Sequence, residues 1–313
     1  MRHSIAVVLA STLAACANNA GHGGLPASDA GSGGGDLTIL FPTQDLAQGA
    51  TDDADTGNGT DDAGDVGDMA IDPCLTRAKL VYTIDQDNNL RSFRPDKLTF
   101  NNIGVLKCPA QFGASPFSMG IDASALAWVV YTSGEIFLVD TQNGQCKPSK
   151  WVPNQGGFDT FGMGFVADKK GSLAEHLFIA GVGNQMIGVV DPIKLVPMNV
   201  GPFTGQPELT GTGDARLWGF FPDPNPRVSE LDKITAKEGM TYPLQALTGS
   251  PSAWAFAFWG GDFWIFLKRG LDQSTHVYHL ESANGKLTDV IPNTGYTIVG
   301  AGVSICAPFN PTH

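Results

Sequence analysis

The oxygen-rich segment Asp85-Gln86-Asp87-Asn88-Asn89 is a place where side-chain spacing could support metal chemistry. Its carboxylate and amide oxygens alternate as at the start of a calcium loop, with Asp96 at the twelfth position. Such loops carry a glycine and a terminal glutamate that are missing here, and Arg91 occupies a ligand position. We therefore expect a hairpin turn and no cofactor, with Ca²⁺ as the weaker alternative.

Catalytic signatures are scarce in the rest of the chain. It contains no His-Glu-x-x-His, no Gly-x-Ser-x-Gly and no phosphate-binding loop. His276 and His279 stand three apart, so on a strand they point to opposite faces and cannot form a ligand pair. Glycoside hydrolysis needs two facing carboxyl groups, but only Glu208 begins a predicted inner strand, with Asp122 and Asp159 nearby in sequence. The sequence therefore predicts no catalytic residue and no metal site.

The elements that must position these side chains follow a repeat of about 45 residues, which begins at Lys79. An apolar strand recurs at 80–84, 126–131, 177–180, 217–221 and 263–267. After a polar turn comes an alternating strand that usually ends in an acid, and a short fourth strand closes the unit. A further strand, rich in Gly and Ala, precedes each pair, as at 117–122 and 161–166.

Four short strands in a unit of this length are typical of a β-propeller blade. Small residues suit the first strand because it lines the crowded axis of the ring. Four units begin near Phe117, Phe161, Gln206 and Ser252, and a fifth combines the C-terminal strand 298–305 with residues 79–107. We predict an all-β, five-bladed propeller closed by strands from both ends of the domain, with six blades or an irregular β-sandwich as alternatives.

Five cysteines are present, and four of them lie in or beside the repeats. These four allow three pairings. In a closed ring Cys306 follows the last inner strand and Cys74 precedes its partner, which favours a Cys74–Cys306 disulfide. Cys108 and Cys146 then lie in adjacent blades and form the second predicted pair. A metal site is the weaker reading because no Cys-x-x-Cys is present.

The N-terminus has the layout of a secretory signal peptide, with Arg2 and His3 before an apolar run at 5–13 and Ala14-Ala15 before the cut. The run of about nine residues is too short to span a bilayer. Leu13-Ala14-Ala15-Cys16 resembles the lipobox of bacterial lipoproteins. The resemblance implies that Cys16 is the lipid attachment site and that the chain is exported. Ala17 in place of the family's retention aspartate implies the outer membrane. The alternative is an ordinary signal peptide with a chance cysteine.

Residues 17–73 differ in composition from the repeats. They contain eleven Asp and no Glu, Lys or Arg, whereas the whole chain has 31 acidic and 19 basic residues and a net charge of −12. Without those Asp and Arg2 in the signal, 20 acidic and 18 basic residues remain, so the acidity belongs to this segment. We expect a disordered spacer, in which the apolar patch 37–41 either contacts the domain or docks a partner. The predicted domains are 1–15, 16–73 and 74–313.

The whole pattern resembles uncharacterised bacterial β-propeller repeat lipoproteins, a resemblance that implies no activity. We expect a membrane-anchored binding or scaffolding module, a monomer with a glycan or protein ligand and no nucleic-acid partner. A polysaccharide hydrolase or lyase is the alternative. The aromatic residues of 254–266 are expected in the core, with sugar stacking as the alternative. The ligand is expected at the loops 112–116, 153–160, 201–206, 248–251 and 292–296, with contacts from Phe158, Asp159, Asn184 and Glu208.

Overall fold

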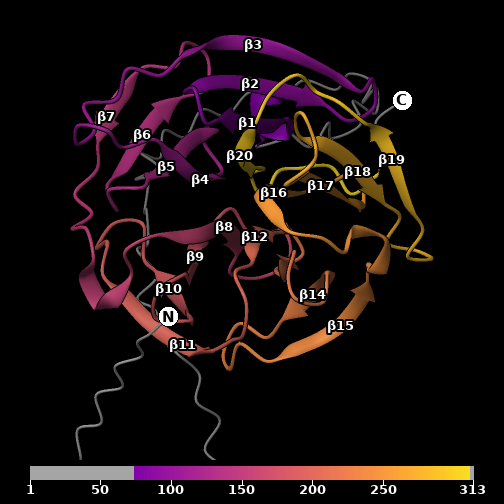
Figure 1. Ribbon diagram of the computed structural model, residues 1–313. Helices are drawn as coiled ribbons and strands as arrows, with labels where there is room; N and C mark the ends of the chain where they lie inside the picture. Colours follow the sequence, from indigo (N-terminus) through magenta and orange to yellow (C-terminus); the bar gives the residue numbers. More distant parts are fainter. Residues whose placement is uncertain (1–73, 311–313) are drawn as a thin grey trace, which may run out of the picture. The chain divides into compact units, whose positions relative to one another are not determined.

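Five four-stranded antiparallel sheets follow one another around a common axis (Figure 1). They lie within residues 74–310, the part of the chain that the computed structural model describes. The first sheet along the chain contains β4 (Pro116–Ile121), β5 (Leu126–Tyr131), β6 (Ile136–Asp140) and β7 (Cys146–Pro148). The second contains β8 (Phe161–Ala167), β9 (Glu175–Gly181), β10 (Met186–Val190) and β11 (Pro197–Pro202). The third contains β12 (Glu208–Gly211), β13 (Leu217–Phe221), β14 (Arg227–Leu231) and β15 (Glu238–Pro243). The fourth contains β16 (Pro251–Trp259), β17 (Asp262–Arg269), β18 (His276–Leu280) and β19 (Leu287–Ile291). The predicted five-bladed propeller is confirmed.

The fifth sheet joins the two ends of the domain, as predicted. It has the order β20 (Ile298–Gly302), β1 (Val81–Asp85), β2 (Asn89–Arg94) and β3 (Thr99–Val105). In its register Tyr82 faces Gly302 and Thr83 faces Ala301. The inner strand is shorter than the predicted 298–305, because the chain leaves the sheet after Gly302 and turns back at Ser304, whose carbonyl accepts the N–H of Ala307.

Further bonds hold this closure together. Cys74 and Cys306 form a disulfide across a sequence separation of 232 residues. The Ser304 hydroxyl donates to the Ala78 carbonyl at 2.8 Å. A second disulfide joins Cys108, after β3, to Cys146 in β7 of the neighbouring blade. Both predicted pairings are therefore confirmed, and each one links segments from different sheets or chain ends.

The small residues of the inner strands allow the blades to approach each other through their backbones. A Cβ on Gly162 of β8 would lie 2.2 Å from the Pro207 carbonyl oxygen, next to β12. A Cβ on Gly300 of β20 would lie 3.0 Å from the Met119 backbone nitrogen in β4. Any larger residue at either position would force two inner strands apart. The Gly and Ala content of these strands is therefore a packing requirement of the axis.

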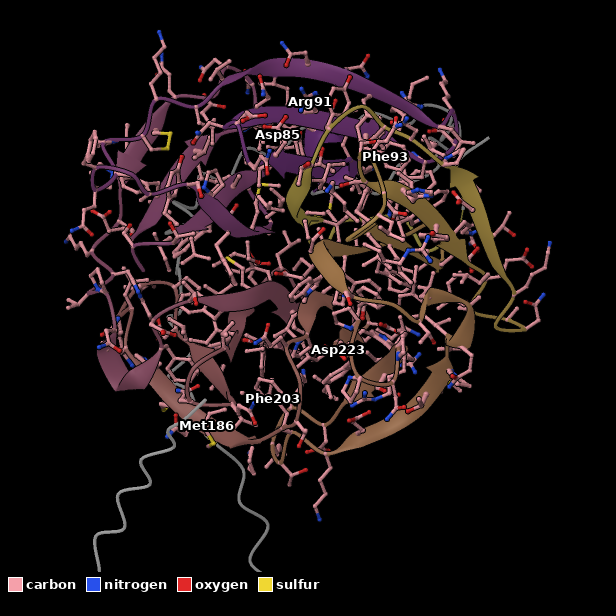
Figure 2. All side chains as sticks on the ribbon, viewed as in Figure 1. Asp85, Arg91, Phe93, Met186, Phe203 and Asp223 are labelled. Atoms are coloured by element: carbon pink, nitrogen blue, oxygen red, sulfur yellow. A yellow bond between two sulfur atoms is a disulfide. The ribbon has the colours of Figure 1, made fainter. Side chains whose placement is uncertain are left out.

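Between the blades, large side chains fill the space that widens away from the axis. Phe93 of β2 packs edge-on against Trp264 and Phe266 of β17, with ring centroids 5.6 and 5.7 Å apart. Figure 2 shows Phe93 beside the β16–β19 sheet, on the same blade as Asp85 and Arg91.

Arg91 lies 2.7 Å from Asp85. Pairing of this kind is what permits buried charge in such a layer.

Residues 1–73 and 311–313 lie outside the described residues, and so do the predicted signal peptide, the lipid site at Cys16 and the predicted spacer. Within residues 74–310, no helix is long and apolar enough to cross a membrane. The helical segments described there are the short 3₁₀ turns η1 (Thr76–Lys79), η2 (Gln155–Gly157) and η3 (Gln245–Leu247).

Candidate functional site

A cavity of about 280 Å³ lies where the inner strands begin, at one end of the propeller axis. Four of the five blades contribute to its wall, so it is a product of ring closure and not of one repeat. Its lining comprises Gln86, Ser115, Pro116, Phe117, Thr132, Glu208, Ser252, Ala253, Trp254 and Val299.

The exposure of the lining residues falls from the rim of the cavity to its base. Gln86, Thr132 and Ser252 are exposed, whereas Glu208 is only 3% exposed. The rim therefore carries one amide and two hydroxyl side chains, and the base carries one acidic residue. The Ser252 hydroxyl donates to the Lys268 carbonyl and the Thr132 hydroxyl accepts the Ser115 N–H. Glu208 is the only charged or titratable residue that lines the cavity in the described part of the chain.

Glu208 is the first residue of β12, and groups from two other inner strands, the neighbouring β8 and β4 across the axis, hold its carboxyl group. Ser118 of β4 donates its hydroxyl hydrogen to Oε2 at 2.7 Å, and the backbone of Met163 in β8 forms another hydrogen bond. Burial raises the pKa of Glu208 well above its ordinary value, although both hydrogen bonds act in the opposite direction. The carboxyl group is thus held by two hydrogen bonds and is almost fully buried.

Aromatic rings form part of the cavity wall. Trp254 of β16 is partly buried, and its indole Nε1 donates to the Gln206 carbonyl at 3.0 Å. That bond fixes the ring at the side of the cavity. Phe117 of β4 is also partly exposed and lines the same space. The arrangement combines flat apolar surface with a few polar groups, which is the usual make-up of a small-molecule site.

The structure places only one of the four predicted contact residues in this cavity. Glu208 lines it, whereas Phe158, Asp159 and Asn184 do not. Phe158 is 0% exposed and packs against Phe161 in the core between blades. Asp159 is exposed and accepts the N–H of Thr160 at 2.6 Å.

Asn184 has a local role in the turn between β9 and β10. Its Oδ1 accepts the backbone N–H of Met186 at 3.2 Å. Its side chain also lies over Gly181, where a Cβ would meet Oδ1 at 2.0 Å. These contacts order the turn itself.

Sequence reasoning placed Trp254 in the core together with Phe256 and Phe258. The core assignment holds for Phe256 and Phe258, which are buried in one cluster with Phe263. Trp254 contacts that cluster but also lines the cavity. Trp254 stands near the beginning of an inner strand, as Glu208 does in its own blade. That position is the sequence signal that could have identified Trp254 as a lining residue of the cavity.

The oxygen-rich segment after β1 forms the predicted turn between two strands. Asp85 is only 3% exposed, and its carboxylate accepts the N–H groups of Asp87 and Asn89 and an N–H of Arg91. The guanidinium of Arg91 also lies 3.7 Å from the ring centroid of Tyr296. In this structure Asp85 is therefore engaged by protein donors.

The two histidines of β18 are also engaged by acidic partners. His276 Nδ1 lies 2.8 Å from an Asp289 oxygen. His279 Nε2 lies 2.8 Å from Asp262, and its ring stacks on Trp264 with centroids 4.6 Å apart. Within residues 74–310, no group of three or more His, Cys, Asp or Glu is arranged to hold a metal ion.

Asp122, considered as a second carboxylate because it stands near a predicted inner strand in the sequence, lies just beyond the opposite end of β4 from the cavity. Its carboxylate accepts the backbone N–H of Leu126 at 2.9 Å and the indole N–H of Trp128 at 3.0 Å. Asp122 does not line the cavity. Neither acid considered as a partner for Glu208 is therefore among the lining residues.

Comparison with known proteins identifies no family for this chain. No family model and no curated protein matches it. Among solved structures, a chain of the nidogen/laminin complex has a TM-score of 0.48 at 11% identity, covering 73% of this chain and 99% of that one. A protein of unknown function from Bacteroides caccae has a TM-score of 0.44 at 12% identity, covering 73% and 84%. The Dos1 propeller has a TM-score of 0.38 at 14% identity, covering 69% and 57%. We draw no functional argument from these values.

Proposed function

We propose that this chain is a lipid-anchored, extracytoplasmic binding protein that takes a small ligand in the axial cavity of its propeller. The observation that carries the proposal is the composition of that cavity. A single carboxyl group lies at its base, aromatic rings form part of its wall, and amide and hydroxyl groups are exposed at its rim. Convergence of a few polar groups in an apolar cleft is typical of ligand sites.

The same composition argues against the hydrolase alternative. Glycosidases generally place two carboxyl groups about 5 to 10 Å apart, one on each side of the scissile bond. Among residues 74–310, Glu208 is the only acid that lines the cavity, since Asp122 and Asp159 lie elsewhere. One carboxyl group with a strongly raised pKa can bind or orient a ligand but does not complete that mechanism.

A cavity-blocking variant tests the proposal. Ser252 is exposed at the rim, so Ser252→Trp should obstruct the entrance without disturbing the core. Ser250→Trp is the matched control, because Ser250 is also exposed, stands two positions earlier and does not line the cavity. We expect a screen of sugars, amines and alcohols by thermal shift, on the detergent-solubilised full chain, to find ligands that S252W loses and S250W retains. If S252W binds every ligand that the wild type binds, the axial site is refuted.

The cellular address is a second part of the proposal and rests on the sequence. The lipobox and the composition divide the chain into three parts. These are a signal peptide at 1–15, a lipidated Cys16 followed by an acidic spacer to residue 73, and a domain from residue 74. Two disulfides suit an oxidising compartment outside the cytoplasm. Globomycin blocks the processing of lipoprotein signals, so we expect the precursor to accumulate under the drug. Normal maturation in its presence would refute lipidation at Cys16.

A further inference from the structure

Among residues 74–310, no cationic side chain acts on the buried carboxyl group of Glu208. Each element packed around it supplies an uncharged group, namely Ser118 from β4, the backbone of Met163 from β8, Phe220 from β13 and Ala253 from β16. No charged side chain among residues 74–310 acts on its pKa. By contrast Asp85, the other deeply buried acid discussed above, is paired with a guanidinium.

We propose that the axial cavity binds an organic ammonium ion, with the Glu208 carboxylate as its counter-ion and the Trp254 ring as part of its wall. The inference rests on the proposed function, since it assigns a ligand class to the same cavity. An ammonium group would form the ion pair with Glu208 that no side chain among residues 74–310 forms.

The hydrogen bonds around Glu208 favour an ionised carboxyl group once a ligand is present. Ser118 donates to Oε2, and the backbone of Met163 adds a second bond that lowers the pKa. Donors aimed at a carboxyl group stabilise its charged form. A neutral hydroxylic ligand would make no use of that form, because it offers no charge to offset the desolvation of the carboxylate.

The cavity wall suits the remainder of such a ligand. Trp254 and Phe117 both line the cavity and both present partly exposed rings. A cation within about 6 Å of an aromatic centroid is attracted to the face of the ring, most strongly for tryptophan. Ala253 and Val299 add small apolar surface for carbon atoms. The exposed rim side chains of Gln86 and Thr132 can select among amines by their substituents.

Binding has a defined proton balance. Burial raises the pKa of Glu208, so without a cationic partner the carboxyl group holds its proton at pH values above its ordinary range. When the intact ammonium ion enters, Glu208 loses that proton to the solvent and the ion pair forms. Affinity should therefore rise with pH through the interval below the raised pKa of Glu208. It should fall again once the amine itself loses its proton, at about pH 10 for an alkylamine.

Isosteric pairs of cations and alcohols test this inference by calorimetry on the full chain. Cyclohexylammonium and benzylammonium are compared with cyclohexanol and benzyl alcohol, and glucose is added as a neutral sugar. We expect the ammonium ions to bind more tightly than the alcohols, and Glu208→Gln to weaken them by about 30-fold or more, as for loss of a buried charge partner. Glu175→Gln is the control, because Glu175 is a largely buried acid that does not line the cavity.

Proton release gives a second readout that needs no variant. In buffers of different ionisation enthalpy, the wild type should release protons when an ammonium ion binds, up to one per ion, and none when an alcohol binds. If alcohols or glucose bind while ammonium ions do not, and S252W abolishes that binding, the ammonium inference fails and the axial site stands. If S252W retains all binding, both fail together.

Discussion

The disulfide that closes the ring should contribute more to stability than the disulfide that joins two blades. Replacing Cys74 and Cys306 together by Ala removes a cross-link with a sequence separation of 232 residues, whereas replacing Cys108 and Cys146 removes one with a separation of 38. In the loop-entropy treatment these separations correspond to about 5.5 and about 4 kcal/mol. The difference of about 1.5 kcal/mol depends only on the logarithm of the ratio of loop lengths.

The native ring should survive the first double substitution, because other contacts hold the closure. β20 remains paired with β1, and Ser304 still donates to the Ala78 carbonyl. The loss should therefore arise in the unfolded chain, which becomes more expanded without its longest cross-link. A larger dependence of the unfolding free energy on urea should accompany the lower stability.

Urea unfolding of the two double variants, followed by tryptophan fluorescence and circular dichroism without reductant, measures both quantities. Coincident transitions from the two probes would justify two-state treatment. We expect C74A/C306A to be less stable than C108A/C146A by about 1.5 kcal/mol. Equal losses of stability, or a greater loss for C108A/C146A, would refute the loop-entropy reasoning. Such a result would mean that native contacts, and not the cross-link, stabilise the closed ring.

Three further predictions concern buried groups, and urea titration measures each of them. Asp85→Ala leaves the Arg91 guanidinium buried without its partner, so we expect the free energy of unfolding to fall by about 3–5 kcal/mol. The exposed Asp87→Ala is the control and should lower it by less than about 0.5 kcal/mol. Equal losses for the two variants would contradict the ion-pair argument. Phe256→Ala empties a fully buried ring site and should cost about 3–5 kcal/mol, and a loss below about 1 kcal/mol would contradict tight packing there. Burial raises the pKa of Glu175 to about 8, so the folded chain keeps a proton that the unfolded chain releases near its ordinary value of 4.5. Stability should fall as pH rises between these values, by up to about 1.4 kcal/mol per unit, and Glu175→Gln should reduce that slope.

The fold could be predicted because its determinants are local and repeated. Alternating apolar strands, a fixed period and Gly- and Ala-rich first strands each indicate a blade, and the pairing of 298–302 with 81–85 follows once one blade lacks an inner strand. Strand limits were less certain, since they depend on contacts from other segments. The C-terminal strand ends at Gly302 because Ser304 turns toward Ala78, a contact that no local pattern encodes.

The site was only partly predictable, because the direction of a loop side chain is set by its packing partners. Aligning the inner strands placed Glu208 at the mouth of the axis, where the structure has it. Phe158 stands in a connecting segment and turns into the core, where Gly181 and Gly188 leave room for its ring. A Cβ at those two positions would lie 2.9 and 2.7 Å from ring atoms of Phe158. Glycines on two adjacent strands, here β9 and β10, near an aromatic loop residue are a signal for such burial.

The glycine pattern of the inner strands also bears on the burial of Glu208. Gly162 and Gly164 bring β8 into backbone contact with β12, where added Cβ atoms would lie 2.2 Å from the Pro207 oxygen and 2.9 Å from the Thr210 Cα. At that separation the Glu208 side chain can reach Ser118 of β4 across the axis, at 2.7 Å. The hydrogen-bond partners of the carboxyl group are the Ser118 hydroxyl and the Met163 backbone, and no charged side chain among residues 74–310 acts on its pKa. Charge compensation for Glu208 must therefore come from a proton or from a ligand that enters through the open end.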